Sequence, residues 1–192
     1  MTQKEITLIK LAQGGDTEAF SELVAEYDSR VMNLAGSLLG SIEDARDVYQ
    51  EIFIKGYNSL KKYRFKSEFY TWLYRITVNT CLTFRKSRGR RSERFPMRLE
   101  DNPELTVNFP DADAPGADET LLEGELSEML RKAVKQLPPK QRAVVVLRHY
   151  HHKKIREIAE IMSLNEGTVK GYLFRAVRTM KEKLEPYLQG EY

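Results

Sequence analysis

The sequence predicts an all-α protein of two small helical domains joined by a flexible acidic linker, and three observations lead there. Apolar residues recur at helical spacing through most of the chain, and no stretch alternates apolar and polar residues long enough to indicate a strand. From Ser92 to about Ala117 this pattern dissolves into prolines and acids, a linker composition. Helical periodicity then returns at Leu121. We therefore expect domains at 1–92 and 121–192, with the linker at 93–120.

The N-terminal domain is predicted to hold four helices. The first covers 4–13 and ends at Gly14-Gly15, and the second begins at Asp16 and Thr17 and ends at Gly40-Ser41. The third covers 44–60 and the fourth 69–87. The residues expected to face inward on the third and fourth helices are Ala45, Val48, Ile52, Tyr57, Phe69, Trp72, Leu73, Ile76 and Thr80.

The C-terminal domain is predicted to end in a helix-turn-helix. Helices at 121–136 and 140–150 flank Leu137-Pro138-Pro139, and two more, from Ile155 and from Glu166, flank a turn in which Asn165 caps the last helix. An ordinary helical hairpin with a solvated face is the alternative, but the charges on the outer face of the last helix are almost entirely of one sign. That outer face comprises Gly167, Thr168, Lys170, Gly171, Phe174, Arg175, Arg178 and Lys181.

The charge is distributed in three blocks, although the net charge of the 192 residues is only +3. Lysines and arginines outnumber acids 16 to 12 in residues 1–94 and 14 to 6 in 129–192, whereas 95–128 holds one base against ten acids. Two basic blocks, joined by an acidic segment that a polyanion would repel, indicate two units that bind a polyanion. A lone Cys81 fits a reducing compartment, and no apolar run is long enough to span a bilayer. We expect a soluble, cytoplasmic chain.

No combination of residues indicates an enzyme, a metal site or a cofactor. The sequence lacks a glycine-rich phosphate loop and a cysteine pair, and its carboxylates cluster only in the acidic linker. His149, His151 and His152 could be offered as metal ligands, but no further ligand suggests itself. We interpret them as exposed, partly charged residues at a helix end.

The stretch from Tyr63 to Arg91 mixes aromatic and basic residues. Aromatic rings stack on unpaired bases while cations hold phosphates, so this composition favours separated strands over duplex. Phe69 and Trp72 are expected in the core, whereas Tyr63, Phe65, Tyr70 and Tyr74 are expected to be freer to face a ligand. The basic run from Arg85 to Arg91 is more typical of a segment that binds phosphates than of a solvated helix end.

Four stretches, taken together, carry a family resemblance: DARDVYQEIFIKGYNSL, FYTWLYRITVNTCL, LPPKQRAVVVLRHY and IREIAEIMSLNEGTVKGYLFRAVRTMKEKL. In this order and spacing the chain resembles the extracytoplasmic-function sigma factors of bacterial RNA polymerase, in the sigma-70 family. The resemblance implies a subunit without catalysis of its own, whose N-terminal domain binds and opens the promoter −10 element and whose C-terminal domain reads the −35 element.

The resemblance also implies contacts with polymerase and promoter. The apolar surface around Leu137 to Leu147 would dock on the β flap, the linker would run toward the RNA exit path, and an anti-sigma protein, often membrane-bound, would sequester the chain. Contacts to the β′ clamp helices would come from Asp47, Gln50, Glu51 and Phe53. Contacts to the −10 element would come from Tyr63, Arg64, Phe65, Lys66, Ser67, Asn79, Arg85, Lys86, Arg88, Arg90 and Arg91. Contacts to the −35 element would come from Thr168, Lys170, Gly171, Phe174, Arg175 and Arg178.

Two features depart from the family pattern. Gly171 stands where a side chain often bonds a base, so −35 reading would lean on Arg175 and Lys170. The segment HYHHKKIREI makes the lead into the helix-turn-helix more basic. A stand-alone helix-turn-helix regulator with a helical sensor domain is the alternative function, but it would not need the aromatic and basic stretch. A nucleic-acid enzyme is a third possible class, but the sequence offers no candidate metal ligands and no nucleophile paired with a base.

Overall fold

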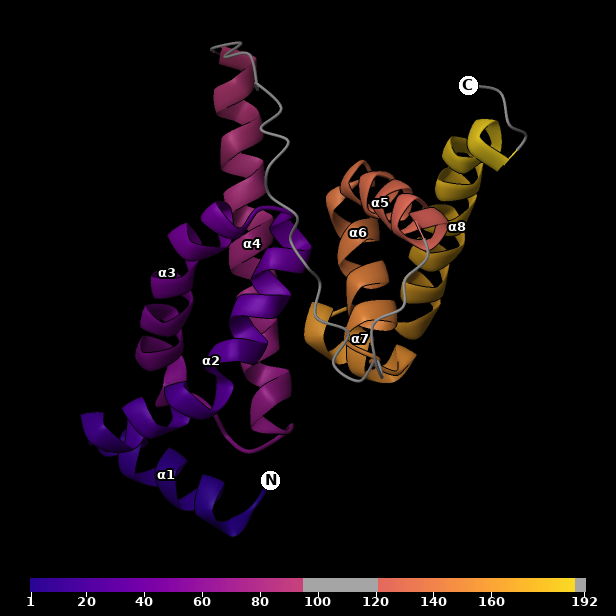
Figure 1. Ribbon diagram of the computed structural model, residues 1–192. Helices are drawn as coiled ribbons and strands as arrows, with labels where there is room; N and C mark the ends of the chain where they lie inside the picture. The colour runs from indigo at the N-terminus through magenta and orange to yellow at the C-terminus, as the bar shows by residue number, and fades with distance from the viewer. Residues whose placement is uncertain (95–120, 189–192) are drawn as a thin grey trace. The chain divides into compact units, whose positions relative to one another are not determined.

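The computed structural model describes residues 1–94 and 121–188, with side chains at 1–88 and 127–185, and the regular elements in these ranges are all helices. No strand occurs in those ranges, as the sequence predicts. The chain folds as two units: α1 to α4 belong to the first, and α5, α6, η1, α8 and the start of α7 to the second (Figure 1). The predicted linker at 93–120 lies outside the described residues except for Glu93 and Arg94. None of the described helices is both long enough and apolar enough to span a membrane.

The first unit consists of α1 (Gln3–Gln13), α2 (Thr17–Leu39), α3 (Ile42–Leu60) and α4 (Phe69–Arg94). The Asp16 carboxylate accepts from the amides of Glu18 and Ala19, so it caps α2 as predicted. Gly40 ends α2 at φ 73°, a left-handed conformation that glycine adopts without strain. Ser41 then caps α3 through the Asp44 amide, and therefore α3 starts two residues before the predicted position.

The core of the first unit lies where α2 packs against α1, α3 and α4 (Figure 1). Its fully buried side chains include Leu23, Leu34, Val48, Ile52 and Val78. Among the predicted core residues, Trp72 and Ile76 are half-buried. Tyr57 was wrongly predicted: it keeps 38% of its surface exposed, and its ring packs edge-on against Phe20 at the rim. α4 also continues to Arg94 instead of ending near Ser87, so its C-terminal end projects beyond α2 and α3 (Figure 1).

The second unit consists of α5 (Leu121–Lys135), α6 (Pro139–Val145), a π-helix η1 (Val146–Tyr150), α7 (Ile155–Met162) and α8 (Glu166–Leu188). α6 packs along α8, and α5 packs against both (Figure 1). The predicted helix at 140–150 forms, but its last turn is π-helical: the His151 amide donates to the Val146 carbonyl at 3.1 Å. Apolar spacing alone cannot distinguish this wider turn from an α-helical one.

The second unit is centred on an apolar run that the sequence analysis had placed on the surface. Leu137 and the five residues from Ala143 to Leu147 are all buried. The predicted apolar surface around Leu137 to Leu147 is therefore wrong as a docking face, because these side chains form the core instead of facing solvent. A short domain needs such a run to cover α8, and this is why it is apolar on consecutive positions.

Candidate nucleic-acid interface

The helix-turn-helix forms as predicted and presents the outer face of α8. Ser163 turns the chain at φ 54°, and the Asn165 carboxamide oxygen accepts from the Thr168 amide at 2.7 Å, which caps α8. Val169 and Ala176 are buried, whereas Lys170, Arg175, Arg178 and Lys181 are exposed. Thr168 and Gly171 are half-buried.

Phe174 is the most prominent side chain of this face, because 72% of its surface is exposed. Burial of such a ring is worth about 1.5–3 kcal/mol, so a partner surface that covered Phe174 would gain free energy of that order. Val177, one turn further on, is 58% exposed. The sequence analysis missed Val177, although its position three residues after Phe174 could have indicated it.

Arg175 lies over two of its neighbours on α8. Its guanidinium lies 5.0 Å from the centre of the Tyr172 ring, in a cation–π contact. A Cβ placed on Gly171 would lie 3.8 Å from both terminal guanidinium nitrogens, in ordinary van der Waals contact. The absence of a side chain at Gly171 therefore leaves space along the helix for the Arg175 side chain.

The loop at 61–68, between α3 and α4, is held together by its aromatic residues. Tyr63 retains only 5% of its surface, and its ring packs against Phe65, Phe69 and Trp72 at centroid distances of 5.0–5.7 Å. Its hydroxyl donates to the Ser67 carbonyl at 2.6 Å. Burial raises the pKa of Tyr63 to about 12.

The expectation that Tyr63 and Tyr74 are free to face a ligand is therefore wrong, since both are buried, while Phe65 and Tyr70 are half-buried. Their spacing places them off the α4 stripe, but loop and helix packing cover them. Trp72, expected in the core, is in turn only half-buried.

Other contacts fix the loop backbone and leave its cations outside. The side-chain amide nitrogen of Gln13 donates to the backbone carbonyls of Leu60 at 3.0 Å and Tyr63 at 2.8 Å. Phe65 has φ 55°, an uncommon conformation for a residue with a side chain. Arg64 and Lys66 are exposed, and Ser67 is half-buried.

The predicted phosphate-binding residues lie along α4. Asn79 and Lys86 are exposed, Arg85 is half-buried, and burial lowers the pKa of its guanidinium below the ordinary value. Arg88 is ion-paired with Asp44 of α3 and also lies over the Phe84 ring. Arg90 and Arg91 belong to α4, but their side chains lie outside the described ones.

A polar face of α3 carries three of the four residues predicted to bind polymerase. Asp47, Gln50 and Glu51 are exposed, and Glu51 pairs with Lys55 at 2.7 Å. Ile54 is exposed by 59% on the same face, seven residues after Asp47. The sequence analysis missed Ile54, although an isoleucine among polar residues at that spacing was the available signal.

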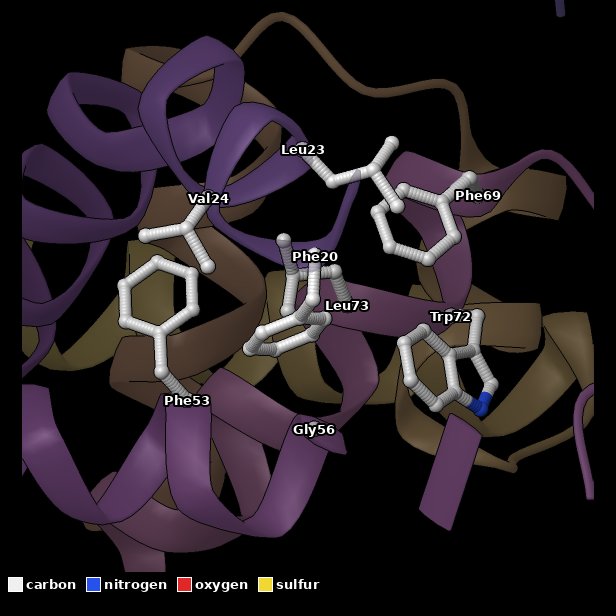
Figure 2. Close-up of a pocket in the computed structure, with 8 residues that line it drawn as sticks. All are labelled: Phe20, Leu23, Val24, Phe53, Gly56, Phe69, Trp72 and Leu73. Atoms are coloured by element: carbon white, nitrogen blue, oxygen red, sulfur yellow. The ribbon is translucent and has the colours of Figure 1, made fainter. Parts of the chain in front are cut away.

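Phe53, the fourth of these residues, turns inward. Only 9% of its surface is exposed, and its ring packs edge-on against Tyr49 at 4.9 Å. Figure 2 shows Phe53 and Trp72 on opposite sides of an apolar pocket in the first unit. The side chain of Phe53 is thus part of the packing, which leaves Asp47, Gln50, Glu51 and Ile54 as the surface of α3.

The histidines in and directly after η1 differ from one another. His149 and His152 are exposed, as expected, but His151 is half-buried. Burial, with the charges of Lys153 and His152, lowers the pKa of His151 to about 4, so the expected partial charge is wrong for this imidazole. Among the residues that the structure describes, no group of three or more side chains could hold a metal ion.

Comparisons with known proteins match residues in both units of the chain. The family model for sigma-70 region 2 matches residues 23–91, and the model for sigma-70 region 4 matches residues 127–180. The chain is 35% identical over 183 residues to an ECF RNA polymerase sigma-E factor of Haemophilus influenzae, covering 94% of this chain and 95% of that protein. It is 32% identical over 187 residues to an RNA polymerase sigma-H factor of Pseudomonas aeruginosa, covering 97% of each.

The chain belongs to the extracytoplasmic-function sigma factors of the sigma-70 family. It is an RNA polymerase sigma factor, a class of non-catalytic initiation factors, and its partners are core polymerase and promoter DNA. A stand-alone helix-turn-helix regulator is not favoured, because the relatives match the first unit as well as the second. The structure of CnrH in complex with the cytosolic domain of CnrY shares the fold, with a TM-score of 0.61 and 22% identity over 99% of this chain and 100% of that one.

Proposed function

We propose that this sigma factor divides promoter recognition between its two units and binds core polymerase chiefly through α3. In this proposal domains 1–92 and 121–192 act at the −10 and −35 elements, with 93–120 as an acidic tether. The observation that carries the proposal is the outer face of α8, on which an aromatic ring is exposed by 72% among basic residues. Such a face suits the major groove of DNA, where cations contact phosphates and base edges.

At the −35 element, α8 lies in the major groove. Lys170, Arg175 and Arg178 approach phosphates or base acceptors, and Phe174 contacts base edges or a methyl group. Thr168 and Gly171 lie nearer the start of α8, where the backbone can approach the DNA closely. Arg178 makes a surface ion pair with Glu182 at 2.9 Å, which a phosphate can replace at small cost.

At the −10 element, the loop at 61–68 receives an unpaired base. Its exposed cations, Arg64 and Lys66, contact the backbone, and the half-buried ring of Phe65 is the one available for stacking. Tyr63 acts as a support that holds the loop shape, together with Ser67. Asn79 approaches the same strand, and Arg85, Lys86, Arg88, Arg90 and Arg91 hold its phosphates.

On the polymerase, the α3 surface of Asp47, Gln50, Glu51 and Ile54 contacts the β′ clamp helices. An exposed isoleucine beside acidic side chains gives that interface an apolar centre within a polar rim. Phe53 supports this surface from beneath. The second unit approaches the β flap through residues other than Leu137 and the run from Ala143 to Leu147, which are buried.

An anti-sigma protein covers one or more of these surfaces when the sigma factor is inactive. This proposal is supported by solved relatives of the same fold that are complexes, such as the sigma factor RpoE with the anti-sigma factor NepR from Bartonella quintana, at TM-score 0.61 and 21% identity. We propose that this chain works in the cytoplasm, where it is held at the membrane if its inhibitor is anchored there.

The first experiment is transcription in vitro with core polymerase, with and without this protein, over a library of genomic DNA. New start sites preceded by a shared pair of −35 and −10 elements are expected. Asp47→Arg should reduce capture of core polymerase, because it reverses a charge on the α3 surface. Glu26→Arg, at an exposed acid of α2, is the matched control. Undiminished capture by the Asp47 variant would reject the α3 assignment.

A further inference from the structure

We infer that Phe174 and Val177 form one apolar patch that recognises the methyl group of a thymine in the −35 element. This inference rests on the proposed role of α8 in the major groove and adds a specificity-determining residue, Val177. Both side chains are more than half exposed, at 72% and 58%. They are three residues apart, so they share one face of α8.

The surroundings of the patch indicate duplex DNA as its occupant. Lys170 lies one turn before Phe174, and Lys181 lies one turn after Val177. Both lysines are exposed, as is Arg178 between them. An apolar patch with cations on both sides matches a groove whose walls are phosphates and whose floor carries an apolar group.

Thymine is the base that provides such a group. In the major groove, adenine, guanine and cytosine present hydrogen-bond donors and acceptors, whereas thymine adds its C5-methyl. A valine side chain cannot form hydrogen bonds, so it can select a base only through apolar contact. Val177 therefore distinguishes thymine from cytosine, the other pyrimidine, which lacks the methyl group.

The start of the same helix lets the patch approach the base edges. Gly167 and Gly171 are one turn apart and carry no side chain, and Gly171 leads to Phe174 within one further turn. Phe174 is thus the first bulky apolar side chain that the DNA meets along this face. Val177 widens the patch on the side of Lys170, because the two are seven residues apart on the helix.

The test uses deoxyuridine, which differs from thymidine only by the missing methyl group. A promoter from the transcription library is made with each −35 thymine replaced singly, and binding of the holoenzyme is measured by competition. We expect one position, or two neighbouring ones, at which the wild-type holoenzyme loses about four-fold in affinity, the value of one buried methyl-sized group. Val177→Ala should bind the normal promoter about four-fold more weakly and show no further loss with deoxyuridine at that position.

Two controls make the result specific. Val177→Ile keeps an apolar side chain and should retain sensitivity to the methyl group. Leu11→Ala removes an exposed apolar side chain of α1, in the other unit, and should leave the deoxyuridine profile unchanged. Val177 and Leu11 are both exposed, so the three variants are expected to fold.

Three outcomes would overturn the inference. In the first, no −35 thymine can be replaced by deoxyuridine with a loss of wild-type affinity. In the second, Val177→Ala loses as much affinity on that replacement as the wild type does. In the third, Val177→Ala binds core polymerase more weakly but keeps the wild-type deoxyuridine profile. The last would assign the patch to a protein contact. If the wild-type protein starts no transcription, the proposed function itself fails; if it starts transcription but ignores deoxyuridine, only this inference fails.

Discussion

The outer face of α8 and the loop at 61–68 have similar compositions and opposite structures. Each places aromatic residues beside cations, and both were predicted to meet nucleic acid. On α8 the ring of Phe174 is exposed by 72%, whereas in the loop the ring of Tyr63 is exposed by 5%. The difference shows that an aromatic residue near cations can serve either as the contact or as the support that positions the contact.

The physical reason lies in the neighbours. α8 is amphipathic, and its buried stripe already satisfies packing through Val169 and Ala176, so Phe174 is left outside. The loop has no regular hydrogen-bond ladder, so its order depends on side chains. Tyr63 provides this order through three aromatic neighbours and a hydrogen bond to Ser67.

The largest expected effect is the difference between substituting Tyr63 and substituting Phe174 in the free energy of unfolding. Tyr63→Ala should lower the free energy of unfolding of the first unit by about 3–5 kcal/mol, because it leaves a cavity among packed rings. Phe174→Ala, its matched contrast, should change the stability of its unit by less than about 0.5 kcal/mol. Trp72 is the single tryptophan, so its fluorescence in a urea titration reports on the first unit, and circular dichroism in the same titration follows the unfolding of both units. Equal effects of the two substitutions would contradict the comparison.

A second test extends the comparison to the half-buried imidazole ring of His151. The pKa of His151 is about 4 in the folded chain against an ordinary value of 6.5, so between these values the unfolded chain binds more protons. The free energy of unfolding of the second unit therefore includes the full contribution of neutral His151 above pH 6.5. It falls by on the order of 2–3 kcal/mol as the pH is lowered toward 4. Circular dichroism should show a smaller pH dependence in His151→Gln, whereas His149→Gln should behave as wild type.

Arg175→Ala sharpens the assignment of α8 as a contact surface. It should weaken holoenzyme binding to the −35 element by about 1–3 kcal/mol while leaving the urea midpoint unchanged. Lys135→Ala, an exposed cation of α5, is the control for general loss of charge. Promoter selectivity that is unaltered in the Arg175 variant would count against this role.

Gln13→Ala tests whether the loop shape matters apart from its aromatic packing. The substitution removes both hydrogen bonds to the carbonyls of Leu60 and Tyr63, which should cost about 1–2 kcal/mol of stability. Promoter opening, measured by permanganate reactivity of unpaired thymines, should decline more than −35 binding does. Gln3→Ala on the same helix is exposed and serves as the control.

The smallest effect concerns the ion pair between Arg178 and Glu182. Glu182→Gln should change stability by less than about 0.5 kcal/mol, since both side chains are exposed. It should raise DNA affinity up to a few-fold at low salt, because it frees Arg178 and removes a negative charge near the phosphates. A loss of affinity would show that Glu182 orients Arg178 for its contact.

Helical periodicity and capping residues could be read directly from the sequence. Asp16, Gly40 and Asn165 end or start helices where predicted, and the exposed basic face of α8 follows from spacing alone. These features are local, because a cap or an amphipathic stripe is defined within a few residues of chain. The family resemblance also depended on such local strings, and the comparisons confirm it.

Only the tertiary structure decided which side chains outside the regular stripes are covered. Tyr63 and Phe53 were expected at the surface and are buried, Tyr57 was expected inside and lies at the rim, and Ile54 is exposed on the α3 face. The apolar run of α6 and η1 proved to be a core, although its composition fitted a docking surface equally well. Burial depends on residues distant in sequence, since α2, α3 and α4 together determine what remains open, and a one-dimensional pattern does not contain that information.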